Sequence, residues 1–194
     1  MIAALTKKNL FPLLIIFLIG SVLYLPSINS PFHFDDDIYV VTNPVVKNLD
    51  LFLSPYETAT GDHLSPALRS AFMTRYLGYL TLAINYHLHA LQVTGYHLVN
   101  LLLHILNGWL LYLIASHIFR GTKLQVPEQH GSNPAMLPLF AALLFLCHPI
   151  QTHAVTYITS RFVLLAAFFS LFSLFAYIRS RTANGAGTLW KTAA

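Results

Sequence analysis

Three consecutive carboxylates, Asp35, Asp36 and Asp37, are the groups of this chain whose type and spacing could do chemistry. They are three of only seven acidic residues among 194, and they follow a long apolar stretch by about ten residues. Carboxylates packed this closely repel one another unless a cation or hydrogen-bond donors compensate. The cluster could therefore supply a general base or a cation site. A solvated acidic loop is the alternative that spacing alone leaves open.

Arg161 is the second residue of interest, because it stands at the start of an apolar segment. An unpaired cation at membrane depth is costly, so we expect it to have an anionic partner. That partner would be a protein carboxylate or a phosphate, which the planar guanidinium fork fits well. A guanidinium that reaches back to the membrane surface from the helix end is the alternative.

A third group of polar residues is spaced at intervals of three, four and three, so its members share one helix face: His97, Asn100, His104 and Asn107. Polar side chains within a membrane normally face other helices and hydrogen-bond with them. A metal site is the weaker interpretation, because the two histidines lie two turns apart and do not form a compact ligand pair.

The composition is that of an integral membrane protein. Hydrophobic residues make up 56% of the chain and charged residues only 9%, whereas soluble domains carry about 25% charged residues. The net charge of +4 does not indicate nucleic-acid binding, because the basic residues are scattered and flank apolar segments. A single cysteine, Cys147, excludes an intrachain disulfide.

The elements that must position these groups are helices in the membrane. Crossing a bilayer takes about 20 apolar residues, and the pattern predicts an all-α protein with about four spans. The lysines and arginines outside the spans favour one side, which places both termini in the cytoplasm and the acidic cluster on the opposite face. The predicted elements are spans at 9–25, 97–119, 135–147 and 162–178 and a large external loop at 26–96.

Within that external loop, residues 68–91 contain an apolar run with a polar stripe at helical spacing, and a helix is expected over 71–90. The stripe and the neighbouring Arg75 favour an amphipathic helix lying in the membrane interface over a fifth span. A fifth span would also move Arg120 and Lys123 to the outer face, against the charge rule. The stripe consists of Ser70, Thr74, Gly78, Thr81 and Asn85.

The remaining segments are predicted to be irregular. Prolines and glycines punctuate residues 43–67 and 120–134, which indicates loops. Residues 182–194 are expected to be a flexible tail. The pattern shows no internal repeat, so residues 1–181 are interpreted as one membrane domain.

Three stretches together resemble polyprenyl-phosphate-dependent glycosyltransferases of the GT-C fold. They are most similar to the membrane part of the tetratricopeptide-repeat-containing branch, which includes the eukaryotic transmembrane O-mannosyltransferases. Phe32-His33-Phe34-Asp35-Asp36 resembles F-x-x-D-D. The second stretch resembles R-P-L, L-N-Y and G-[FY]-H-L-V-N-L-x-x-H. It comprises Arg75-Tyr76-Leu77, Leu82-Ala83-Ile84-Asn85-Tyr86 and Gly95-Tyr96-His97-Leu98-Val99-Asn100, with His104 four residues later. The third stretch comprises His148-Pro149-Ile150, Ala154-Val155 and Arg161, and resembles H-P-x-x-x-E-[AS]-V with its following arginine.

The resemblance implies a partial GT-C fold and roles for individual residues. It implies that Asp35 or Asp36 is the base that activates an acceptor hydroxyl on the non-cytoplasmic face. It implies that Arg75, Arg161 and His148 bind the phosphate of a lipid-linked sugar donor or other parts of the substrate. The expected partners are membrane lipid, a polyprenyl-phosphate sugar and a protein or glycan acceptor. No metal ligand is assigned, although a divalent cation remains open as a cofactor.

Two departures from the family pattern bear on activity. His153 stands where the family has an acidic residue, and Tyr76 replaces a proline. The chain is also shorter than such enzymes, so it is interpreted as their N-terminal part. The expected location is the bacterial inner membrane or, in a eukaryote, the endoplasmic reticulum. The alternative function is that of a non-catalytic multi-pass protein that binds a polyprenyl lipid or a partner membrane protein.

Overall fold

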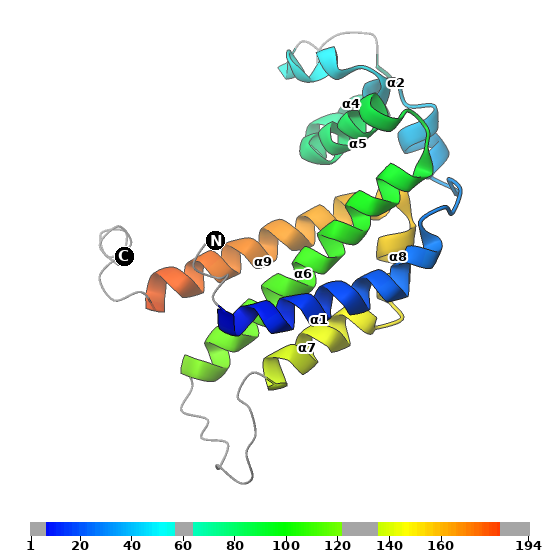
Figure 1. The fold of residues 1–194 in the computed structure, drawn as a ribbon. Coiled ribbons are helices and arrows are strands. Elements are labelled where there is room, and N and C mark those ends of the chain that lie inside the picture. The colour runs from blue at the N-terminus through cyan, green and yellow to red at the C-terminus, as the bar shows by residue number, and fades with distance from the viewer. Residues whose placement is uncertain (1–6, 57–63, 122–135, 183–194) are drawn as a thin grey trace, which may run out of the picture. The chain divides into compact units, whose positions relative to one another are not determined.

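The computed structural model describes residues 7–56, 64–121 and 136–182, and in this part of the chain every regular element is helical. Figure 1 shows the helices along the chain. Three of them are long and apolar enough to cross a membrane: α1 (Lys7–Tyr24), α6 (Val93–Gly121) and α9 (Arg161–Thr182). The all-α prediction is therefore confirmed, as are three of the predicted apolar helices.

The fourth predicted span is helical but short. Helix α7 (Met136–Cys147) has 12 residues, or about 18 Å of length, which is less than the roughly 30 Å of a bilayer core. Four complete spans are therefore not confirmed. The expected tail lies mostly outside the described residues, because α9 includes Thr182 and the description ends there.

Contacts along the chain divide it into two compact groups of residues. The first, here the span unit, comprises the described residues of 7–23, 102–151 and 166–182. The second, here the loop unit, comprises the described residues of 24–101 and 152–165. Both units draw on α6 and α9. The acidic cluster lies in the loop unit.

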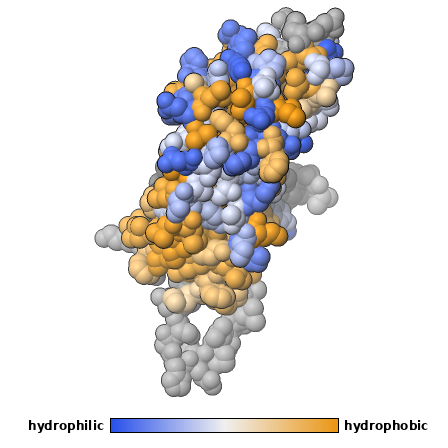
Figure 2. All heavy atoms as spheres, turned by 90° about the vertical axis from the view of Figure 1, so that its right-hand side faces the viewer, coloured by the Kyte–Doolittle hydropathy of each residue, from blue (hydrophilic) through white to orange (hydrophobic). Residues whose placement is uncertain are grey.

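The span unit is built on close helix contacts at small residues. A β-carbon at Gly20 of α1 would lie only 2.9 Å from the Ile105 side chain of α6. Leu146 of α7 also approaches Gly20, and Ile16 beside it is fully buried. Small residues at such crossings let membrane helices approach closely. Large apolar side chains elsewhere reach the surface over a broad area (Figure 2).

Prolines in the loop unit start helices where irregular structure was expected. Pro44 is the first residue of α2 (Pro44–Lys47), and Asn43 caps it by accepting a hydrogen bond from the Val45 N–H at 2.9 Å. Pro66 likewise starts α4 (Pro66–Thr74) behind the cap residue Ser65. Proline suits this position because the first N–H of a helix needs no internal partner. The prediction of a loop over 43–67 was therefore wrong at both ends, and residues 57–63 lie outside the description.

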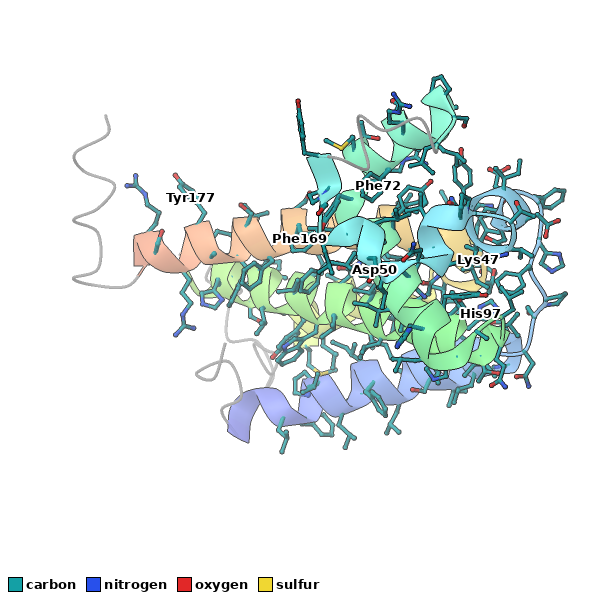
Figure 3. The ribbon with its side chains drawn as sticks, turned by 90° about the horizontal axis from the view of Figure 1, so that it is seen from above. Lys47, Asp50, Phe72, His97, Phe169 and Tyr177 are labelled. Atoms are coloured by element: carbon teal, nitrogen blue, oxygen red, sulfur yellow. The ribbon has the colours of Figure 1, made fainter. Side chains whose placement is uncertain are left out.

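The core of the loop unit is rich in aromatic side chains. Phe52, Phe72 and Tyr76 meet edge to face with ring centroids 5.3 to 5.4 Å apart, a favoured aromatic geometry. Figure 3 shows Phe72 on α4. The buried core residues are Val40, Val45, Val46, Phe52, Leu64, Phe72, Tyr79, Leu82, Ala83, Tyr96 and Ile158.

The predicted helix over 71–90 is broken in two at Arg75. Helix α4 ends at Thr74, Arg75 adopts a non-helical backbone, and α5 (Tyr76–His89) continues from there. The polar stripe was expected to face water, but its residues Gly78 and Asn85 on α5 do not. Gly78 and Asn85 are buried in the loop unit, whereas Leu77 and Ile84 are exposed.

Gly78 is predicted to be essential to this packing. A β-carbon there would lie 2.2 Å from the Phe162 ring, so Gly78→Ala forces the ring or helix to move. Overpacking costs about 1–3 kcal/mol, and the better helix propensity of alanine returns about 1 kcal/mol. We expect a net loss of up to about 2 kcal/mol in thermal or denaturant unfolding. Gly108→Ala is the control, because its nearest neighbour is a flexible leucine methyl at 3.2 Å; equal effects would contradict the prediction.

Candidate functional site

Asp36 is a buried carboxylate with both oxygens engaged. The Thr159 N–H donates to its Oδ1 at 2.9 Å, and the His33 N–H donates to its Oδ2 at 3.1 Å. Only 1% of the residue is exposed. A buried charge is tolerated when such donors surround it. Asp36 therefore fastens the acidic turn to the segment that precedes α9.

Asp35 differs from its neighbour in being exposed. Its backbone N–H donates to the Tyr157 hydroxyl oxygen at 2.9 Å, and its carbonyl accepts from the Tyr39 N–H at 2.9 Å. These contacts hold the backbone of Asp35, while the residue itself is exposed. This is the arrangement of a carboxylate that can meet a ligand.

Asp37 begins an unusual element. Residues Asp37–Val41 form a π-helical turn, closed by the Thr42 N–H donating to the Asp37 carbonyl at 2.8 Å. Asp37 itself is exposed. Such turns are rare in proteins and are frequent at functional sites.

Tyr157 and His153 lie beside this turn. Their rings pair at 4.8 Å between centroids, and the Tyr157 hydroxyl supports Asp35 as described. Sequence reasoning noted His153 only as a departure from the family pattern and missed Tyr157. Nothing in the local sequence marks Tyr157, because its partner is 122 residues away.

Arg161 is fully buried and is surrounded by neutral acceptors. Its Nε donates to Asn100 Oδ1 at 2.9 Å and one terminal nitrogen donates to Asn85 Oδ1 at 2.6 Å. The terminal nitrogens also donate to the carbonyls of Thr81 at 3.2 Å and Tyr96 at 2.9 Å. These four acceptors are neutral, and none of them is the expected anionic partner. The alternative of a guanidinium that reaches back to the membrane surface is wrong, because the residue is 0% exposed.

The amides that hold Arg161 come from the two polar patterns found in the sequence. Asn100 belongs to the polar face of α6, and its Nδ2 also donates to the carbonyls of Tyr157 and Ile158 at 3.1 and 3.3 Å. Asn85 and Thr81 belong to the stripe on α5. The two polar faces therefore meet at one guanidinium, which sequence reasoning did not foresee.

The histidines of the α6 face form hydrogen bonds with backbone carbonyls. His97 Nε2 lies 2.9 Å from the Ser30 carbonyl, and Figure 3 labels His97 on α6. In the span unit, His104 Nε2 lies 3.2 Å from the Leu146 carbonyl. The expectation of hydrogen bonds from this face is confirmed. Among the described residues, no group of three metal-ligating side chains comes together.

Arg75 is the exposed cation of the loop unit near the acidic turn. Its guanidinium carbon lies 5.8 Å from the ring centroid of Tyr39 and 5.2 Å from that of Phe162. Stacking of this kind orients a guanidinium while leaving its edge free for an anion. Burial raises the pKa of nearby Tyr79 from its ordinary 10.0 to about 12.

His148 belongs to the span unit. It is exposed just beyond α7, and its Nδ1 accepts the Ile150 N–H at 3.2 Å. The acceptor role of Nδ1 places the proton of a neutral ring on Nε2. An imidazole in this state can donate a hydrogen bond to an anion.

The comparisons with known proteins find curated relatives. The chain is 28% identical over 172 residues to a protein O-mannosyl-transferase of Caenorhabditis elegans, covering 89% of this chain and 24% of that protein. It is 31% identical over 186 residues to protein O-mannosyl-transferase TMTC4 of Homo sapiens, with 89% and 24% covered. For Tmtc1 of Drosophila melanogaster the values are 29% over 188 residues, with 92% and 19% covered.

No family model matches the chain, and no solved structure matches it. The chain spans about a quarter or less of the length of these relatives. These relatives, all named protein O-mannosyl-transferases, nevertheless match about 90% of this chain. These similarities place the chain in the TMTC family of protein O-mannosyl-transferases, as a homologue of about a quarter of their length.

Proposed function

We propose that this chain supplies the acidic loop and part of the membrane domain of a GT-C glycosyltransferase. The enzyme would transfer a sugar, which the names of the relatives suggest to be mannose, from a polyprenyl-phosphate donor to an acceptor hydroxyl. The acceptor would be a protein or glycan on the non-cytoplasmic face. The observation that carries the proposal is an exposed carboxylate, Asp35, fixed beside a buried one, Asp36.

The two carboxylates would divide the work. Asp35 would take the proton of the acceptor hydroxyl as that oxygen attacks the sugar carbon. The polyprenyl phosphate would leave with the electron pair of the bond that breaks. A base needs access to the acceptor, and this favours Asp35. Asp36 accepts two backbone N–H groups and would serve as the residue that positions the turn.

The charge of the leaving phosphate needs donors near it. Arg75 is the best suited, because its guanidinium is exposed and held by the aromatic rings of Tyr39 and Phe162. His148 is assigned to substrate binding by the family resemblance alone. Arg161 would act indirectly, since its donors are directed at Asn85, Asn100 and backbone carbonyls. A divalent cation remains an open possibility in the proposal.

The proposed topology follows the charge pattern. Helices α1, α6, α7 and α9 would be the four crossings, with α7 crossing only if other protein covers its ends. Both termini would lie in the cytoplasm, and residues 26–96 would lie outside, with α4 and α5 in the interface. Residues 1–181 would form part of one membrane domain. In a eukaryote the membrane would be that of the endoplasmic reticulum.

A second candidate is a non-catalytic membrane protein that binds a polyprenyl lipid or a partner membrane protein. The observation that favours it is the enclosed state of Arg161, which takes that cation from the set of phosphate ligands. His153, in place of an acidic residue of the family pattern, also favours it.

The intact enzyme that contains this chain, reconstituted into vesicles, distinguishes the two candidates. With a polyprenyl-phosphate mannose labelled in the sugar, the enzyme hypothesis predicts label in protein or glycan acceptors, measured after lipid extraction. The non-catalytic hypothesis predicts saturable binding of the labelled lipid without transfer. The absence of both transfer and binding would contradict both hypotheses.

A further inference from the structure

Phe34 stands directly before Asp35 and is unusually exposed. Its exposed fraction is 88%, and no other large apolar side chain in the described part of the chain is more exposed. An aromatic ring in water forgoes the stabilisation that burial would give. The ring therefore needs an explanation outside the packing of the loop unit.

The backbone of Phe34 adds a second cost. Its φ is +48°, in the left-handed region where the β-carbon of an L-residue crowds the following carbonyl oxygen. Glycine is the residue that normally occupies this conformation. A bulky residue held there indicates a constraint imposed by the surrounding structure and is often associated with function.

The constraint comes from the turn around it. The Asp36 N–H donates to the His33 carbonyl at 3.0 Å, while the His33 N–H donates back to Asp36 Oδ2 at 3.1 Å. The Phe34 carbonyl accepts the Asp37 N–H at 3.2 Å. The turn is thus closed by main chain and side chain together. It holds the Phe34 ring outward without covering it.

The lipid bilayer is the best candidate for the partner that covers the Phe34 ring, because Phe34 follows an apolar span closely in the sequence. The apolar span of Leu10–Ser27 ends only seven residues before Phe34. Seven residues reach at most about 25 Å when extended, and turns shorten this distance, since the Ile28 and Ser30 N–H groups donate to the carbonyls of Leu25 and Ser27. Ile38, four residues beyond Phe34, is also exposed, at 60%.

We propose that Phe34 inserts its ring into the headgroup layer of the membrane and so sets the height of the acidic turn above it. Aromatic side chains are suited to the boundary between headgroups and acyl chains. The carboxylates of Asp35 and Asp37, both exposed, would stay in water beside the ring. The strained backbone at Phe34 would then hold the ring in the orientation in which it contacts the membrane. This inference does not depend on sugar transfer.

Tryptophan placed at position 34 measures the depth of the ring. The variant is Phe34→Trp with Trp109 and Trp190 replaced by phenylalanine, in vesicles of dioleoylphosphatidylcholine. Spin-labelled lipids carry the quencher at the fifth or the twelfth acyl carbon. We expect blue-shifted emission that the shallow quencher reduces more than the deep one. Leu18→Trp, at an exposed position within α1, is the matched control and should show the reverse order.

Two results would overturn the proposal. In the first, the tryptophan at position 34 emits at a wavelength typical of water, iodide quenches it, and neither lipid quencher reduces its emission. This would show that the ring stays in solution. Emission that no quencher reduces would show that protein covers the ring.

Phe34→Gly separates the ring from the turn. Because glycine accepts a positive φ, the variant should melt at the same or a higher temperature. With a tryptophan reporter in place of Ile38, loss of the Phe34 ring should lower quenching by the shallow lipid at least about twofold. Unchanged quenching would refute the anchoring role. A clear drop in melting temperature would also count against it, because the ring would then be packed within the protein.

Discussion

Arg161→Met is expected to lower the free energy of unfolding by about 3 kcal/mol or more. The substitution leaves two buried acceptors, the amide oxygens of Asn85 and Asn100, without this donor. The carbonyls of Thr81 and Tyr96 also lose it, but they lie inside α5 and α6 and keep their helical hydrogen bonds. Each unsatisfied buried acceptor costs about 1–3 kcal/mol. Because methionine carries no charge, the variant no longer has the desolvation cost of a buried guanidinium, which is several kcal/mol. The net loss of stability is therefore smaller than the summed cost of the unsatisfied acceptors.

The matched control is Arg181→Met, which removes an exposed arginine near the end of α9 and should change stability by about 0.5 kcal/mol or less. Arg161→Lys should fall between the two, since one ammonium group cannot reach acceptors on several sides as the guanidinium does. Denaturant unfolding in detergent, followed by circular dichroism, measures all three. Equal stability of the Arg161 and Arg181 variants would refute the structural role.

The loss should extend to the acidic turn. Asn100 binds both Arg161 and the carbonyls of Tyr157 and Ile158, and the same segment holds Asp35 and Asp36. Freeing this segment would loosen both aspartates. Arg161 would thereby influence chemistry without touching a substrate.

Asp35→Asn is expected to reduce sugar transfer by about a hundredfold to ten-thousandfold with little change in stability. Its carboxylate is exposed and its supporting contacts are made by the backbone, so the folded chain loses little. The amide cannot accept the acceptor proton. Asp37→Asn is the control at an equally exposed neighbour and should retain transfer.

Asp36→Asn should behave differently from both. Its new NH₂ group would face one of two backbone N–H donors, Thr159 or His33. Hydrogen bonds to a charged group contribute about 1.5–3 kcal/mol, and we expect a stability loss of that order. A fall in transfer by Asp36→Asn would therefore mix lost folding with lost positioning. Unchanged stability would contradict the fastening role.

Much of the helical architecture could be predicted from the sequence. Uninterrupted apolar length located α1, α6 and α9, because bilayer thickness sets a minimum that few other segments satisfy. The ends were less predictable: α6 begins at Val93, before the apolar run expected from His97. Proline was misread at Pro44 and Pro66, because it breaks a helix interior but starts a helix well.

The candidate site was predictable in its residue types but not in its pairings. Spacing identified the polar faces of α5 and α6, yet it could not show that Asn85 and Asn100 converge on one arginine. Charge alone suggested an anion for Arg161, because sequence reasoning did not count how many neutral oxygens tertiary packing could supply. The difference between Asp35 and Asp36 likewise depends on Thr159, 123 residues away.

Transfer by the Asp35→Asn protein tests the proposed base most directly. The intact enzyme that contains this chain, with and without the substitution, is reconstituted at equal folded amounts, established by the melting curves, and supplied with the labelled polyprenyl-phosphate mannose. The account predicts unchanged melting and a transfer rate at least about a hundredfold lower. Transfer within about twofold of the unaltered chain, a difference far below that expected from loss of a general base, would contradict it.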